Sequence, residues 1–188
     1  VEVMQKCVDQ DAGPGAVAGW FVHDRHARTD RPRFAGWWGH EKESRFRMGP
    51  EFLPTPGADG WQLSNPPILA LAPLRASLDL FDRAGGMAAL RTKSLKLTGF
   101  LESLIQARLP DVLQIITPSD PQQRGAQLSL RVIGGRERGR ELFDYLVSVG
   151  TLGDWREPDV IRISPAPLYN RLMDVYPFVE VVEAWRGF

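Results

Sequence analysis

The sequence predicts an α/β protein in which an irregular first third precedes a compact layer of helices and a small sheet. Residues 24–65 are rich in Gly, Pro and charged residues and contain no long periodic segment. From about residue 85, the hydrophobic periods follow the order helix, strand, strand, helix, strand, helix. This order is typical of helices packed on one face of a small sheet.

The first elements are assigned from turn residues and apolar spacing. Residues 13–23 join a Gly-Pro turn to a nearly all-apolar run, which predicts a strand buried on both faces. A helix is expected to follow Pro66 and Pro67, with a kink near Pro73. Apolar residues at helical spacing then predict a long amphipathic helix over 87–108 that Pro110 ends.

The later elements alternate more regularly. Residues 126–132 place apolar side chains at every second position, the pattern of a strand covered on one side. Gly150 is expected to end the helix that precedes it. Pro177 is expected to kink the last helix. The remaining predicted elements are strands at 112–116 and 159–164 and helices at 138–150 and 170–185.

The composition excludes several classes of partner. Of the 188 residues, 23 are Lys or Arg and 23 are Asp or Glu, so no net charge attracts nucleic acid or an anionic membrane. The single cysteine, Cys7, and the lack of an apolar run of roughly 20 residues indicate a cytoplasmic protein without a membrane span. Because the chain starts at Val1, we expect it to begin inside a longer protein.

Common catalytic and metal-binding motifs are not found in the sequence. It contains no paired-cysteine spacing, no HExxH, no GxSxG and no GxxxxGKS. His23 and His26 lie three positions apart in a strand-like context, where they would not converge on one ion. We therefore expect no metal site.

Three isolated features remain as candidate sites. Trp37, between Gly36 and Trp38, either plugs its loop into the core or offers its ring N–H and flat face to a phosphate or an aromatic cofactor. Asn65, before Pro66, is expected to cap the next helix, and because an anion can bind at the same position, an anion contact is compatible with that interpretation. Arg162, on a predicted strand, is either solvated and salt-bridged or a bidentate carboxylate clamp.

Four long segments together resemble kynureninase, a pyridoxal-phosphate (PLP) enzyme of the aspartate-aminotransferase fold. They are "AGPGAVAGWFVHDRH", "RFAGWWGHEKESRFRM", "PGADGWQLSNPPILALAPLRASLDLFD" and "DWREPDVIRISPAPLYNRLMDVYPFVE". The resemblance runs from about Ala12 to the C-terminus. It implies that residues 1–70 end the PLP-binding large domain and that residues 71–188 form the small α+β domain.

The resemblance also implies an activity and three site residues. Kynureninases are homodimers that hydrolyse the Cβ–Cγ bond of L-kynurenine or 3-hydroxy-L-kynurenine to anthranilate or 3-hydroxyanthranilate and L-alanine, in tryptophan catabolism and NAD biosynthesis. By this resemblance, Trp37 contacts the PLP phosphate region and Asn65 lies at the cofactor across the dimer interface. Arg162 holds the substrate α-carboxylate.

The resemblance breaks at the catalytic lysine. Ungapped alignment puts Val8 where the family has its Schiff-base lysine, and valine cannot form that bond. Lys6, two positions earlier, would be displaced by roughly 7 Å along a strand. We therefore assign no catalytic residue and expect an inactive or incomplete fragment. The alternative is a noncatalytic dimerisation module that binds a full-length homologue.

Overall fold

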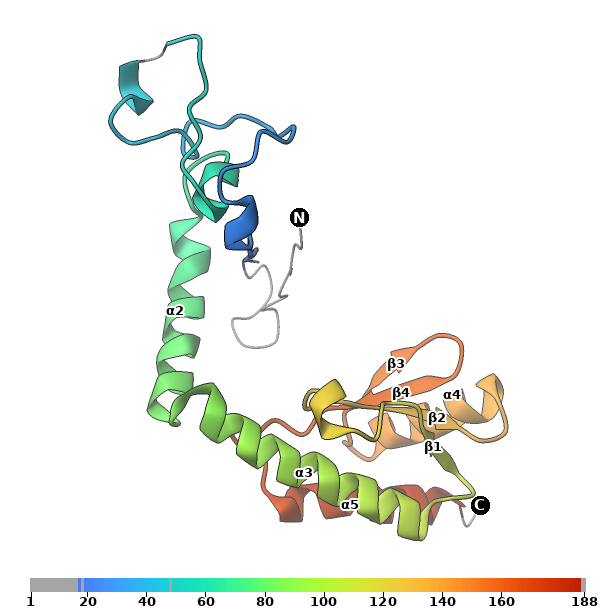
Figure 1. The fold of residues 1–188 in the computed structure, drawn as a ribbon. Helices are drawn as coiled ribbons and strands as arrows, with labels where there is room; N and C mark the ends of the chain where they lie inside the picture. The colour runs from blue at the N-terminus through green and yellow to red at the C-terminus, as the bar shows by residue number, and fades with distance from the viewer. Residues whose placement is uncertain (1–16, 18, 48, 187–188) are drawn as a thin grey trace. The chain divides into compact units, whose positions relative to one another are not determined.

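The computed structural model describes residues 17, 19–47 and 49–186 (Figure 1). The chain divides into two compact units, Val1–Leu80 and Phe81–Phe188. The first is mostly irregular, and the second contains the sheet. The predicted contrast between an irregular first third and a regular remainder is therefore confirmed.

Short hydrogen-bonded turns organise the first unit. Within its described residues it contains three 3-10 helices, η1 (Asp24–His26), η2 (Arg45–Arg47) and η3 (Ala58–Trp61). An isolated antiparallel bridge joins His40 to Pro54. On either side of it, the Glu41 N–H donates to the Leu53 carbonyl at 2.9 Å and the Thr55 N–H donates to the Gly39 carbonyl at 2.8 Å. These bonds give the Trp-containing segment a defined backbone without regular secondary structure.

Helix α2 (Ile68–Arg83) begins directly after the two prolines, as predicted, and contains Pro73. The Pro67 carbonyl accepts hydrogen bonds from the N–H groups of Ala70 and Leu71, both at 3.0 Å. Proline is tolerated at such a start because its missing N–H would have no partner there. The helix therefore starts three residues after Asn65.

The described residues of the second unit form a four-stranded antiparallel sheet, three α-helices and one 3-10 helix, η4 (Pro121–Gln123). Helix α3 (Gly86–Arg108) covers the predicted 87–108 segment. The sheet has the order β1-β2-β4-β3. Its strands are β1 (Leu113–Ile115), β2 (Leu128–Val132), β3 (Asp154–Arg156) and β4 (Val160–Ile163), and the other helices are α4 (Arg136–Ser148) and α5 (Leu172–Arg186). The predicted class of mixed helix and sheet is confirmed.

One face of the sheet builds the core. In β2, Leu128, Leu130 and Val132 are buried, whereas Ser129 and Arg131 lie on the other face. The buried residues pack with apolar side chains from all three α-helices of the unit, among them Leu101, Ile105, Leu142, Leu146 and Val179. Each such side chain contributes about 1.5–3 kcal/mol of transfer free energy. The helices therefore lie on one face, as the alternation predicts.

Two predictions about strands were incomplete or wrong. Strand β3 was not predicted, because three residues are too few to show an alternation and the strand depends on pairing with β4. Residues 20–23 form no strand and Gly19 makes only a single β-bridge, and Trp20 and Phe21 are 49% and 52% exposed. A buried strand needs neighbours on both edges, which the described part of the first unit does not supply. Residues 13–16 and 18 of that prediction lie outside the described residues.

Candidate cofactor and substrate contacts

Residues 36–40, which we call the tryptophan turn, present the indole of Trp37 to the surface. The turn is closed by a hydrogen bond from the Gly39 N–H to the Gly36 carbonyl at 3.0 Å. Trp37 is 43% exposed, and its ring meets that of Trp38 edge-on with centroids 5.2 Å apart. Its ring N–H makes no hydrogen bond with any described residue. Trp37 therefore does not plug its loop into the core, and its ring N–H remains an unused donor, while its ring also lies beside Phe46, with centroids 5.9 Å apart.

The glycines of the turn allow close backbone packing. A Cβ added to Gly36 would lie 2.2 Å from the Leu63 backbone, and one added to Gly39 would lie 2.8 Å from the Gln62 carbonyl oxygen. No side chain larger than hydrogen fits at either position. The tryptophan turn therefore packs directly against residues 60–63, and Asn65 follows two residues after Leu63.

Asn65 is exposed and does not cap helix α2. Its side chain makes no hydrogen bond with the residues that the structure describes. The helix begins at Ile68, so Asn65 lies too early for the capping position. Its amide is left with free donors and a free acceptor. Of the two interpretations of Asn65, capping is therefore wrong.

Arg162 lies on the face of the sheet opposite the core. Its Cα is in register with that of Ser129 on β2 and that of Asp154 on β3. The Arg162 Nε–H donates to Asp154 Oδ2 at 2.6 Å, and Nη2 donates to the same oxygen. The side chain of Arg162 is 29% exposed. Arg162 is therefore salt-bridged, but Nη1 and part of Nη2 take no part in this pair.

Asp154 is held in its charged form. Desolvation by burial raises the pKa of its carboxyl, but the hydrogen bond and charge of Arg162, with Arg156, outweigh this and lower the pKa below its ordinary value. The Arg156 Nε lies 3.0 Å from the same Oδ2. Around Arg162, the outer face therefore carries the Asp154 carboxylate between two guanidinium groups, a local excess of positive charge that suits an anionic ligand.

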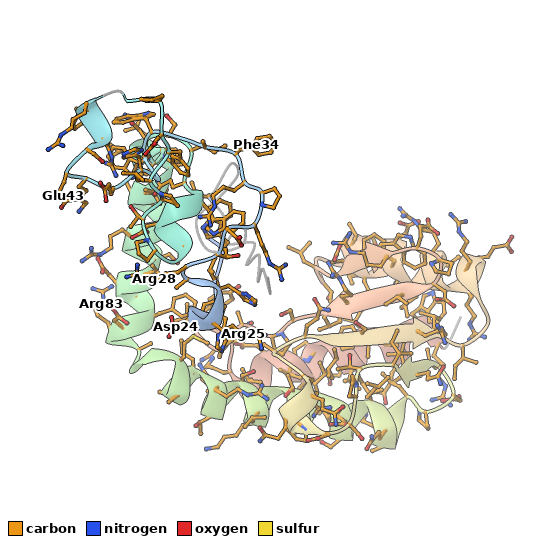
Figure 2. The ribbon with its side chains drawn as sticks, turned by 45° about the horizontal axis from the view of Figure 1, so that its top comes forward. Asp24, Arg25, Arg28, Phe34, Glu43 and Arg83 are labelled. Atoms are coloured by element: carbon orange, nitrogen blue, oxygen red, sulfur yellow. The ribbon has the colours of Figure 1, made fainter. Side chains whose placement is uncertain are left out.

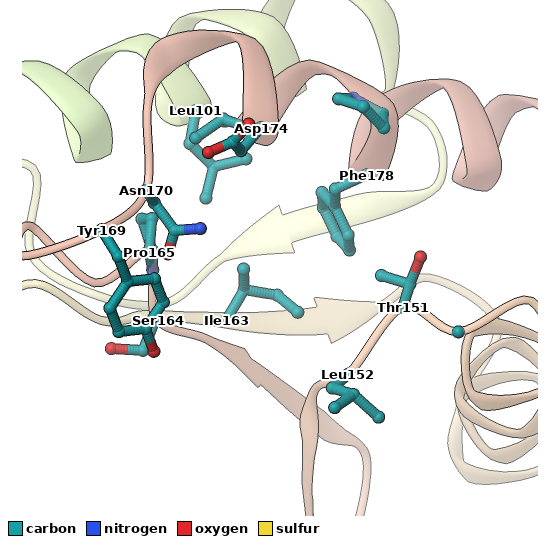
Figure 3. A pocket seen from close by; sticks show the side chains of 13 residues that line it. Leu101, Thr151, Leu152, Ile163, Ser164, Pro165, Tyr169, Asn170, Asp174 and Phe178 are labelled. Carbon is teal, nitrogen blue, oxygen red and sulfur yellow. The ribbon is translucent and has the colours of Figure 1, made fainter. Parts of the chain in front are cut away.

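A cavity of about 440 Å³ opens beyond the end of β4, beside the start of α5 (Figure 3). Ile163, Asn170 and Asp174 contribute to its lining. The side-chain oxygen of Asn170, Oδ1, already accepts a hydrogen bond from the Ala166 N–H at 2.7 Å. Arg162 does not line the cavity, since alternation turns it to the other face of β4. The cavity is therefore distinct from the candidate carboxylate contact.

The candidate residues fall into two groups. Trp37 and Asn65 belong to the first unit, and Arg162 belongs to the second. Val8 and Lys6 lie outside the described residues. Within the described part of the chain, no three His, Cys, Asp or Glu side chains are grouped as metal ligands. In the same part, no helix combines the length and the hydropathy needed to span a bilayer.

Sequence reasoning missed Asp154 and Arg45. Asp154 was overlooked because its strand was not predicted, although an acidic residue eight positions before Arg162 is visible in the sequence. The Arg45 guanidinium reaches back to the tryptophan turn, where Nη2 donates to the Trp38 carbonyl at 2.6 Å. No periodic signal marks that contact, because Arg45 lies in a run of charged residues that resembles a solvated surface.

Comparisons with known proteins agree over most of the chain. Residues 90–182 match the kynureninase C-terminal domain family. The chain is 72% identical over 178 residues to kynureninase of Stenotrophomonas maltophilia (strain K279a). It is 70% identical over 177 residues to kynureninase of Xanthomonas oryzae pv. oryzae (strain PXO99A). Each alignment covers 94% of this chain but 42% of the relative, so the chain spans less than half of the length of these relatives.

Solved structures show the same fold at low identity. A mutant of C-DES with glycine covalently linked to its PLP cofactor aligns with a TM-score of 0.66 and 21% identity, over 90% of this chain and 42% of that one. The apo cysteine desulfurase from Thermococcus onnurineus NA1 aligns with a TM-score of 0.66 and 16% identity, over 94% and 45% of the two chains. The predicted aspartate-aminotransferase type of fold is therefore confirmed.

Proposed function

The chain belongs to the kynureninase family and matches its C-terminal portion, and on this premise we propose that it supplies part of a kynureninase active site. The reaction is hydrolysis of the Cβ–Cγ bond of L-kynurenine or 3-hydroxy-L-kynurenine to anthranilate or 3-hydroxyanthranilate and L-alanine. The observation that carries the proposal is the 72% identity over 94% of the chain. The physiological context would be tryptophan catabolism and NAD biosynthesis in the cytoplasm.

Trp37 and Asn65 are proposed as contacts of the PLP phosphate region. Both side chains keep hydrogen-bond donors that no described residue uses, and both reach the surface of the first unit. An indole N–H and an amide NH₂ suit phosphate oxygens, which only accept hydrogen bonds. When bound, PLP supplies an electron sink for carbanion chemistry. The two residues of this chain would orient the cofactor.

Arg162 is proposed to hold the substrate α-carboxylate. Asp154 engages Nε and Nη2 along one side of the guanidinium, which supports the use of the end formed by Nη1 and Nη2 for a second carboxylate. Such a two-point contact fixes the orientation of the substrate as well as its position. Asp154 would thereby act as a positioning residue that keeps the Arg162 guanidinium from rotating.

Residues 1–70 are proposed as the end of a PLP-binding large domain and residues 71–188 as the small domain. We propose further that residues 1–188 alone are inactive, because Val8 occupies the aligned position of the Schiff-base lysine. A full site would need further polypeptide from a longer chain or from a homologous subunit, with a homodimer as the active form.

An interaction module that lacks catalysis is the second candidate. Large apolar side chains are strongly exposed in the first unit, including Phe34 at 85% (Figure 2), Phe46 at 78% and Leu69 at 89%. Exposed apolar surface of this kind favours contact with another polypeptide. Co-purification with a full-length homologue, without any gain in kynurenine turnover, would support this candidate over the first.

A chimaera tests the proposed function. Residues 12–188 of this chain would replace the matching C-terminal portion of the S. maltophilia kynureninase, so that the other 58% or so of that protein, the remainder after the 42% covered, is unchanged. We expect anthranilate and L-alanine from L-kynurenine, and no product from residues 1–188 alone. A folded chimaera that retains PLP but releases no anthranilate would contradict the proposal.

A further inference from the structure

Arg45 closes the tryptophan turn from the side. Its Nη2 donates to the carbonyls of Trp38 and His40, at 2.6 and 3.0 Å. These two carbonyls flank Gly39, the residue that packs against the backbone of Gln62. Hydrogen bonds from a charged donor to a carbonyl are stronger than those between neutral groups. One guanidinium nitrogen therefore fixes the backbone on both sides of Gly39.

The same guanidinium covers the paired indoles. Its Cζ lies 4.8 Å from the ring centroid of Trp38 and 5.9 Å from that of Trp37. Both distances are within the range of cation–π attraction. Arg45 thus contacts both the backbone of the turn and its two indoles.

The placement of Arg45 is not that of an ordinary surface arginine. Its Nε is buried and has no hydrogen-bond partner among the described residues. A surface arginine would turn this group to water, because an unpaired buried N–H is unfavourable. The contacts with the turn therefore determine where the side chain lies. Arg47, two residues later in the same 3-10 helix, is exposed and differs in this respect.

We propose that Arg45 is the positioning residue of the cofactor contact: it orients the tryptophan turn so that Trp37 presents its free ring N–H outward. The effect of Arg45 on cofactor binding rests on the proposed function, in which that N–H contacts the PLP phosphate. We expect that lysine does not replace arginine here, since an ammonium lacks the flat guanidinium group that lies over the indoles while one of its nitrogens bonds the two carbonyls.

The orientation of the turn can be measured without cofactor. Two indoles at 5.2 Å and nearly perpendicular should give an exciton couplet in the circular dichroism spectrum of the 188-residue chain, with Trp38→Phe as the reference that abolishes it. We expect Arg45→Lys and Arg45→Met to lose most of the couplet while helix content is unchanged, and Arg47→Lys to keep it. A wild-type couplet in folded Arg45→Lys would overturn the inference.

Cofactor binding gives the second readout, in the chimaera. Arg45→Lys should weaken PLP binding about tenfold, the scale of one hydrogen bond to a charged group, and leave the affinity for pyridoxal, which has no phosphate, unchanged. An equal loss for both ligands would contradict a phosphate-specific role. Trp37→Phe tests the cofactor contact separately from the role of Arg45. If Trp37→Phe leaves the PLP affinity unchanged, the proposed contact between Trp37 and the PLP phosphate is contradicted. The couplet of the Arg45 variants still decides whether Arg45 orients the turn.

Discussion

Arg162 and Asp154 face each other across strands β4 and β3, with their Cα atoms in register and the Arg162 Nε 2.6 Å from Asp154 Oδ2. The pair uses the side of the guanidinium formed by Nε and Nη2 and leaves the end formed by Nη1 and Nη2 available to a second acceptor. A salt bridge and a carboxylate clamp are therefore compatible interpretations of the same arginine. The pair also ties a three-residue edge strand to the sheet next to the proposed substrate contact.

Replacing Asp154 by Asn in the chimaera should raise the KM for kynurenine several-fold with a smaller change in kcat. The carboxylate that fixes the guanidinium would be lost, whereas the arginine itself would remain. Steady-state kinetics measure this effect. Asp144→Asn is the matched control, because Asp144 pairs with Arg140 at an exposed helical site. Equal KM values for the two variants would contradict a positioning role for Asp154.

The pH dependence of Asp154 follows from the same pair. Because Arg162 and Arg156 outweigh desolvation and lower the folded-state pKa, the pair stabilises the fold above the ordinary carboxyl pKa. That stability is lost as the pH falls through the lowered pKa. Replacing Arg162 by Gln should move the Asp154 pKa upward, as measured by NMR titration of the carboxyl carbon in the 188-residue chain. Arg131→Gln, which disrupts a pair with Asp159, should leave the pKa of Asp154 unchanged.

Gly36→Ala should disrupt the tryptophan turn. The new Cβ would lie 2.2 Å from the Leu63 backbone, so the two segments must separate. We expect faster cleavage within residues 24–65 in limited proteolysis and loss of the Trp37–Trp38 couplet. Gly49→Ala is the control, because its Cβ would meet nothing within 4 Å. Indistinguishable proteolysis of the two variants would show that the close approach is not required.

Leu130→Ala should destabilise the second unit by about 2–5 kcal/mol, because it leaves a cavity in a fully buried position on β2. Leu152→Ala, at a position that is 83% exposed, should change stability by less than about 0.5 kcal/mol. Urea unfolding followed by circular dichroism measures both. A small effect of Leu130→Ala would contradict the location of the core on this face of the sheet.

The sequence predicted what depends on local periodicity. Helix α3 and strand β2 show long, regular apolar patterns, and both appear where expected. Strand β3 has only three residues and exists through its pairing with β4, so no local pattern marks it. The strand expected near Trp20 fails for a related reason: an apolar run becomes a buried strand only where neighbouring strands accept its hydrogen bonds.

The candidate site was predictable only in its residues, not in their partners. The alternation of a strand is enough to place Arg162 on the face opposite Ile161 and Ile163, but Asp154 lies opposite it only because two strands pair in one register. Arg45 contacts the carbonyls of Trp38 and His40 through a loop with no repeat. Such contacts depend on tertiary packing of irregular chain, which local periodicity does not encode.

The most direct test compares kynurenine kinetics of the chimaera with Arg162 and with Arg162→Lys. Removing one bidentate charge-assisted contact should raise the KM for L-kynurenine about 10- to 100-fold, with anthranilate still released. Arg131→Lys, on the same face of the sheet, should keep the original KM. If Arg162→Lys also keeps the original KM, or if the chimaera with Arg162 forms no anthranilate, this chain does not supply the carboxylate contact of a kynureninase site.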